Sequence, residues 1–138
     1  MRILALDVGD KRIGVAISDM TGTIARNVTT LERGNKDIAE ELREINQEFN
    51  VEQIVIGIPF RIDGTEGAQA KKVREFAGRL EQKIDLPFKE WDERFTSAQA
   101  EKVLISADMK RNKRKSVIDQ VSATLILQSY LDNLNRKT

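Results

Sequence analysis

The chain has 138 residues, of which 40% are hydrophobic and 33% are charged, and its formal net charge is +1. This length suits one domain with a core of its own, and the balanced charge gives no sign of a bulk attraction to polyanions. The sequence contains no cysteine and no histidine, which excludes disulfides, thiolate zinc sites and histidine acid–base chemistry. Any catalysis must therefore use carboxylates, Lys, Arg, hydroxyls and hard cations.

Hydropathy predicts a cytoplasmic protein with no membrane partner. Every apolar run is shorter than the roughly 20 residues that span a bilayer, and no secretory signal pattern opens the chain. Repeats and low-complexity segments are also missing from the sequence. We therefore expect a single domain over residues 1–138.

The first part of the chain reads as three strands. Residues 2–6 and 12–18 are apolar runs joined by a tight turn that contains glycine, and residues 23–31 form a weaker third run. No helical period separates the three runs. An antiparallel meander is the expected arrangement.

The rest of the chain alternates between helical and strand patterns. We expect a helix over 38–49 capped by Asn35 and stopped by Asn50, a strand over 54–58, a helix from near Thr65, a strand over 86–91, a helix over 96–107 and a last helix over 116–134. A meander followed by strand–helix–strand–helix–strand predicts an α/β fold. Its five-stranded mixed sheet would carry helices on both faces.

Asp7 is the most informative residue, because a carboxylate at the end of a buried strand is costly unless something uses it. Three explanations remain open. Asp7 caps the turn at Val8–Asp10, belongs to a hairpin that handles phosphate, or binds a metal ion.

Two further carboxylates are expected at the same edge of the sheet. If the first, fourth and fifth strands are neighbours, right-handed crossovers make them parallel, and their carboxyl ends then share one edge of the sheet. Glu93 leaves the fifth strand, and Asp119 falls in the first turn expected for the last helix. Each also has a simpler explanation: Glu93 as a surface charge paired with Arg94, and Asp119 as part of a helix cap that begins at Ser116.

If the three acids do gather, they require a cation. Ligands that are all oxygen suit Mg²⁺ or Mn²⁺. Two such ions can activate a water molecule and stabilise the leaving oxygen of a phosphodiester. This chemistry needs no histidine, in agreement with the composition.

Basic residues flank these acids. A predicted loop holds five of them: Lys110, Arg111, Lys113, Arg114 and Lys115. Such a loop is either a solvated turn or a grip on phosphates. Arg12, Arg61 and Arg94 either contact nucleic acid or brace the carboxylates. Thr65 is expected to cap its helix, whose N-terminus is also able to hold a phosphate.

Four segments, taken together, resemble the YqgF (RuvX) family. They are residues 7–19, residues 55–59 with 63–67, residues 92–96 and residues 115–123, and they follow one another from Arg2 to about Leu131. The resemblance implies a ribonuclease H-like fold related to RuvC-type Holliday junction resolvases. It also implies that Asp7, Glu93 and Asp119 are catalytic acids that work with divalent metal.

The family is associated with maturation of the 5′ end of precursor 16S rRNA and has been proposed to resolve Holliday junctions. Two departures stand out in this chain. Related nucleases often hold four carboxylates, and Asp10, Asp19 and Asp92 are the candidates for a fourth. Ser122 stands in the last motif, where a more alanine-rich run is expected.

The first hypothesis is therefore a metal-dependent endonuclease that processes precursor rRNA, with ribosomal precursor particles as partners. Resolution of four-way DNA junctions is an alternative, and it favours a symmetric homodimer. A second class is an ATP-binding phosphotransferase domain, for which 138 residues leave little room. A third is a non-catalytic RNA-binding module that assists ribosome assembly.

Overall fold

The computed structural model describes residues 2–34, 37–95 and 111–136, with the backbone alone for 95 and 111–121. The expected helix over 96–107 and Lys110 lie outside these residues. The strands are β1 (Arg2–Val8), β2 (Arg12–Ser18), β3 (Ala25–Glu32), β4 (Val51–Ile58) and β5 (Phe88–Asp92). The helices are α1 (Ile38–Phe49), α2 (Ala68–Glu81) and α4 (Arg111–Arg136), with a short 3₁₀ turn η1 (Glu93–Phe95) after β5.

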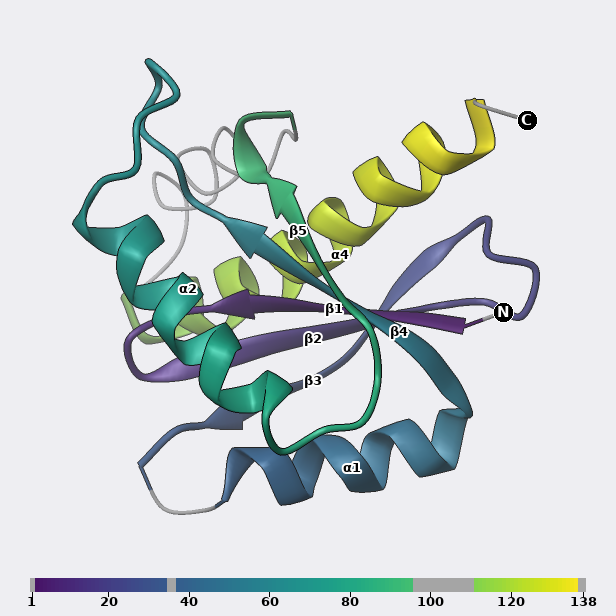
Figure 1. Cartoon of the computed structure of the whole chain (residues 1–138). Coiled ribbons are helices and arrows are strands. Elements are labelled where there is room, and N and C mark those ends of the chain that lie inside the picture. Colours follow the sequence, from purple (N-terminus) through teal and green to yellow (C-terminus); the bar gives the residue numbers. More distant parts are fainter. Residues whose placement is uncertain (1, 35–36, 96–110, 137–138) are drawn as a thin grey trace.

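The five strands form one mixed sheet in the order β3-β2-β1-β4-β5. β1 pairs antiparallel with β2, and β2 pairs antiparallel with β3. β1, β4 and β5 are parallel neighbours, as the crossover rule predicts. The sequence-based topology is thus confirmed, and the carboxyl ends of the three parallel strands lie at one edge (Figure 1).

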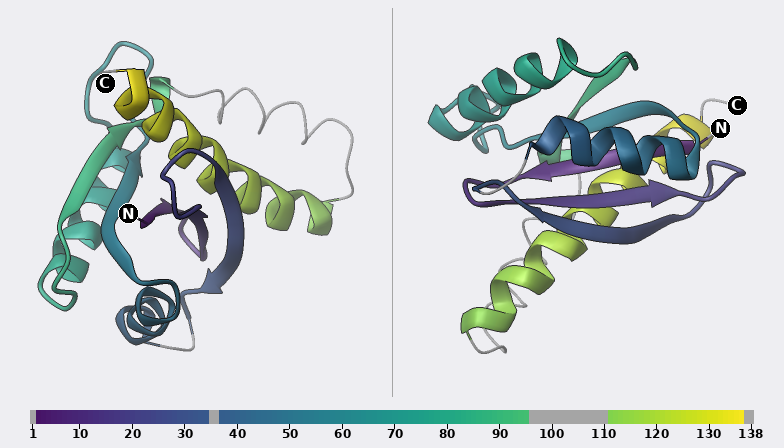
Figure 2. Two further views of the ribbon diagram at one scale, coloured as in Figure 1. Left: turned by 90° about the vertical axis from the view of Figure 1, so that its right-hand side faces the viewer. Right: turned by 90° about the horizontal axis from the view of Figure 1, so that it is seen from below.

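Helices cover both faces of the sheet, as expected. α1 and α2 lie on one face and α4 crosses the other (Figure 2). Alternation along β1 sends Leu4 and Leu6 into the cluster with α1 and α2, and sends Ile3 and Ala5 into the cluster with α4. The next residue in the second set is Asp7, so Asp7 belongs to the α4 face.

The limits of α1 follow from its two caps. Asp37 is the N-cap, because its Oδ1 accepts a hydrogen bond of 3.0 Å from the N–H of Ala39. The expected cap at Asn35 is therefore wrong. Asn50 ends the helix in the left-handed conformation, with φ of 54°, as predicted.

α2 begins later than predicted, and Thr65 is not its cap. Asp63 Oδ1 accepts hydrogen bonds from both the hydroxyl and the N–H of Thr65, at 2.7 and 3.0 Å. This local turn competes with helix formation, and Gly67 takes the N-cap position instead. Thr65 therefore does not stand at the N-terminus of the helix, where a phosphate would bind.

α4 begins at Arg111, five residues earlier than predicted. Arg111–Lys115 are thus helical and do not form a loop, because Lys and Arg favour helices and no Gly or Pro interrupts the segment. Asp119 consequently lies about two turns inside the helix, at roughly 3.6 residues per turn. No described helix is both long and apolar enough to cross a membrane.

Candidate active site at the carboxyl edge of the sheet

Asp7 lies inside β1, one residue before the end of the strand, and its side chain is 8% exposed. The turn that follows is closed by the N–H of Gly9, which donates to the carbonyl of Arg12 at 2.8 Å. Asp7 is therefore a strand residue and not part of the turn. Its neighbour across the sheet in β2 is Gly14.

The neighbour of Asp7 on the other side is also a glycine. Leu6 pairs with Ile56 in the parallel ladder, so the next position along both strands brings Asp7 beside Gly57. Neighbouring strands are about 4.8 Å apart. The glycine on each side leaves no neighbouring side chain beside Asp7 in the sheet, and Glu93 and Ile126 fill the space above Gly57.

Glu93 reaches this space from the far side of Gly57. It starts η1 directly after β5, and it is 2% exposed. A Cβ atom on Gly57 would lie 3.1 Å from Glu93 Oε1 and 2.6 Å from Ile126 Cδ1 of α4. The carboxylate of Glu93 is therefore packed between β4 and α4, and the expectation that it is a surface charge is wrong.

Asp7 and Glu93 thus lie on the same face of the sheet, to either side of Gly57. Buried carboxylates on one face of a sheet offer a place where a divalent cation can bind. Their ligand atoms are all oxygen, which fits Mg²⁺ or Mn²⁺. The described side chains include no group of three acids that could hold a metal ion, and the side chain of Asp119 lies outside the description.

The backbone position of Asp119 is described within α4. It precedes Ser122, Ala123 and Ile126 by three, four and seven residues, and these three residues are buried. Residues at such spacings share one stripe of a helix. The side chain of Asp119 is not described, so its place as a third carboxylate at this edge stays a prediction.

One candidate for a fourth acid, Asp19, has another role, and a second, Asp10, is exposed. Asp19 follows β2 and so lies at the opposite edge of the sheet, where its carboxylate accepts from the N–H groups of Thr23 and Ile24 and from the hydroxyl of Thr21. The hydrogen bond from Thr23 is the main reason that the pKa of Asp19 is lowered. Asp10 is exposed in the turn after β1.

Asp92, the third candidate, is engaged by Arg94. The guanidinium of Arg94 contacts Asp92 Oδ2 at 2.7 Å and also donates to the carbonyl of Ile62 at 3.2 Å. Burial acts to raise the pKa of Asp92, but the hydrogen bonds and charge of Arg94 lower it below its usual value. Gly64, with φ of +90°, packs against the same guanidinium. Arg94 therefore fastens the β4–α2 loop to the end of β5.

The other two predicted arginines also lie at the carboxyl edge. Arg12 Nε donates to Glu32 Oε1 at 3.0 Å, and this pair joins the ends of β2 and β3. Arg61 packs on Gly67, where a Cβ atom would lie 2.8 Å from its Nε. The ion pairs described for Arg12 and Arg94 are with Glu32 and Asp92 and not with Asp7 or Glu93. Bracing of the site acids and contact with nucleic acid both remain predictions for all three arginines.

Sequence reasoning missed two residues that shape the site. Gly14 and Gly57 each stand inside an otherwise apolar strand, next to Asp7 in the sheet. A glycine in a strand interior often marks a place where another group approaches closely. That signal was present in the sequence for both residues.

Comparison with known proteins agrees with this architecture. A family model described as "RuvX: Holliday junction resolvase" matches residues 1–133. A protein of Thermoanaerobacter pseudethanolicus named "Putative pre-16S rRNA nuclease" is 49% identical over 139 residues, which cover 99% of this chain and 100% of that protein. A relative of the same name from Clostridium kluyveri is 47% identical over 137 residues, with 99% and 100% coverage.

Among solved structures, a similar fold is found in "T. thermophilus RuvC in complex with Holliday junction substrate". The TM-score is 0.62, with 13% sequence identity and coverage of 100% of this chain and 97% of that one. This likeness shows that the fold is the ribonuclease H-like fold of RuvC. The family match and the identity to the full-length relatives together establish that the chain belongs to the RuvX family.

Proposed function

We propose that this protein is an endonuclease that hydrolyses phosphodiesters in structured nucleic acid and depends on divalent metal. The observation that carries the proposal is the placement of Asp7 and Glu93, both buried, to either side of Gly57. Membership of a family of nucleases supports it. Asp7, Glu93 and Asp119 would hold Mg²⁺ or Mn²⁺ within the one domain.

The bound ions would supply an activated water molecule and stabilise the charge on the leaving oxygen. The protein's own contribution is to fix the ligands. Asp7 is held by the pairing of β1 on both sides, and Glu93 is held by packing between β4 and α4. Because both side chains are buried, the acids need little rearrangement to bind a cation.

The proposed substrate is precursor 16S rRNA, cut during 5′-end maturation in ribosomal precursor particles. The names of the full-length relatives favour this choice. A four-way DNA junction is the second candidate, favoured by the description of the family model. Symmetric cutting of a junction would require a homodimer.

We propose that basic residues at the same edge hold the phosphates of the substrate. Arg111, Lys113, Arg114 and Lys115 follow one another in the first turns of α4, ahead of Asp119. Lys110, Arg12, Arg61 and Arg94 complete the predicted set. Binding through such contacts weakens as the salt concentration rises.

A cleavage assay tests the proposal. Precursor 16S rRNA, a four-way DNA junction and single-stranded controls are incubated with Mg²⁺ or Mn²⁺ and either the wild type or Asp7→Asn. Asp19→Asn is the matched control, since it changes an acid at the opposite edge. We expect cutting by the wild type and the control and none by Asp7→Asn. Equal cutting by all three would show that Asp7 is not catalytic.

The same assay distinguishes a nuclease from a non-catalytic RNA-binding module. A pure RNA-binding module would cut nothing under any metal condition. Its salt-dependent RNA binding would survive replacement of all three acids.

A further inference from the structure

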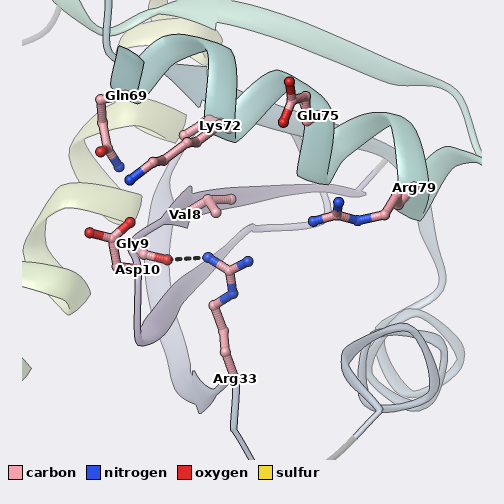
Figure 3. A pocket seen from close by; sticks show the side chains of 9 residues that line it. Val8, Gly9, Asp10, Arg33, Gln69, Lys72, Glu75 and Arg79 are labelled. Atoms are coloured by element: carbon pink, nitrogen blue, oxygen red, sulfur yellow. Dashed lines mark hydrogen bonds between the residues drawn. The ribbon is translucent and has the colours of Figure 1, made fainter.

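A second, polar pocket lies at the carboxyl edge on the face opposite the two buried acids. Its volume is about 220 Å³, and it lies between the β1–β2 turn, the residue after β3 and α2 (Figure 3). The side chains that line it are mostly polar or charged: Asp10, Arg33, Gln69, Lys72, Glu75 and Arg79. None of these residues belongs to the nucleic-acid-binding set predicted from sequence.

Arg33 and Arg79 both lie over one aromatic ring beside this pocket. The guanidinium of Arg33 lies 4.4 Å from the ring centre of Phe76, and that of Arg79 lies 5.9 Å from it. Arg33 Nη1 also donates to the carbonyl of Gly9 at 2.6 Å. A guanidinium stacked on a ring keeps its N–H groups in one plane, where they can bind a phosphate.

Lys72 adds a third cation from α2. Figure 3 shows its ammonium group beside the amide of Gln69 and above the turn at Gly9–Asp10, while Glu75 points away from Arg33. The ion pairs found among the described residues involve Arg12, Arg74 and Arg94 and none of the three cations of this pocket. Three positive charges therefore face a small polar space.

A pocket at the opposite edge of the sheet gives an internal comparison. There, Arg2 and Arg26 stack on Phe49 in a similar way. Each pocket is lined by two carboxylates, Asp10 and Glu75 in the first and Glu48 and Glu52 in the second. The first has three cations, however, and the pocket beside Phe49 has only Arg2. Stacked arginines alone thus do not distinguish the two edges, whereas the excess of cations does.

The size and chemistry of the pocket favour a phosphate group. Pockets for whole small molecules are usually about 300–1,000 Å³ and mainly apolar, whereas this one is smaller and lined by charge. Val8 and Gly9 form part of its lining, and they directly follow Asp7 in the chain. The pocket and Asp7 therefore lie at the same edge of the sheet, on opposite faces of the end of β1.

We infer that Arg33, Lys72 and Arg79 form a phosphate-binding subsite for the nucleic-acid backbone next to the phosphate that is cut. The inference rests on the proposed nuclease function. The subsite holds one backbone phosphate on the α2 face while the acids on the α4 face meet the scissile phosphate. It thus sets how the strand lies across the end of β1.

The test measures binding and cutting separately. The double variant K72Q/R79Q is compared with K71Q/K83Q, which removes the same charge from exposed lysines outside the pocket. Fluorescence anisotropy in EDTA measures the affinity of each protein for a labelled single-stranded RNA over a range of salt concentrations. Circular dichroism checks that both variants are folded.

Loss of the one phosphate held by the subsite should make the slope of log affinity against log salt shallower by roughly 0.7. That corresponds to about a fivefold weaker affinity near 0.1 M salt for K72Q/R79Q, and K71Q/K83Q should remain close to the wild type. Equal weakening by both double variants, or no weakening by either, would overturn the subsite.

Failure of the nuclease proposal would look different. A wild type that shows the expected binding pattern but cuts no substrate would contradict the nuclease and support the subsite. Active cutting together with equal affinities of the two double variants would contradict only the subsite.

Discussion

The two faces of the sheet differ in what they bury. The face under α1 and α2 is packed with apolar side chains such as Leu6, Ile56 and Val73. The face under α4 carries all four buried polar or charged residues found among the described part of the chain, which are Asp7, Ser18, Glu93 and Ser122. Among the described residues, the face under α1 and α2 has the larger apolar cluster, and the face under α4 combines a smaller apolar cluster with the two buried acids.

The largest effect on function should come from Glu93→Gln. We expect cleavage to fall at least about a thousandfold, equivalent to roughly 4 kcal/mol of barrier, because the variant loses a charged ligand of the proposed metal site. Rates measured with Mg²⁺ and with Mn²⁺ test this. A variant that cuts at the wild-type rate would remove Glu93 from the mechanism.

On the apolar face, Leu6→Ala should reduce the stability of the protein and leave metal binding unchanged. Leu6 is fully buried and adjacent to Asp7 in the chain, but it points to the other face. We expect the free energy of unfolding to fall by about 2–5 kcal/mol, with Mn²⁺ affinity retained in the folded protein. Urea unfolding in EDTA measures the loss. A change below about 0.5 kcal/mol would contradict the assignment of this face as the main core.

Gly57→Ala should affect both stability and metal binding. The new Cβ would lie 2.6 Å from Ile126 Cδ1 and 3.1 Å from Glu93 Oε1, so α4 or Glu93 must move. We expect a loss of about 1–3 kcal/mol in stability and weaker Mn²⁺ binding. Gly78→Ala in α2 is the matched control, because its Cβ meets nothing within 4 Å and should stabilise the helix by up to about 1 kcal/mol. Similar behaviour of the two variants would refute the role given to Gly57.

The smallest effect is expected at Asp19, far from the proposed site. Its pKa is lowered in the folded protein, chiefly by the hydrogen bond from Thr23, so its carboxylate stabilises the fold above the unfolded-state pKa near 4. That contribution is lost as the pH falls through the lower, folded-state pKa. Asp19→Asn should therefore be slightly less stable than the wild type at pH 7, and the gap should close in acid. A gap that widens toward low pH would contradict this sign.

Much of the fold follows from local patterns in the sequence. The period of the apolar residues fixed the order of the strands, and the right-handed crossover rule placed β1, β4 and β5 in parallel. The first and last residues of the helices were less predictable. Thr65 looked like a helix cap, but Asp63 binds it in a turn. The start of α4 was missed because basic residues suit both a loop and a helix.

The candidate site was predictable in its acids but not in its shape. Asp7 stood out because a carboxylate interrupts an apolar strand, and Glu93 followed from the end of β5. The space between them depends on Gly57, whose meaning appears only when β1, β4 and α4 are placed together. The pocket at Arg33 was not predictable, since its cations come from segments that meet only in three dimensions.

Direct measurement of Mn²⁺ binding gives the sharpest test of the central claim. Electron paramagnetic resonance would count the bound Mn²⁺ in the wild type, Asp7→Asn, Glu93→Gln and the control Asp19→Asn. We expect the wild type and Asp19→Asn to bind Mn²⁺ alike, and each variant at Asp7 or Glu93 to bind at least tenfold more weakly. Equal affinities in all four proteins would contradict a shared cation site between these two buried acids.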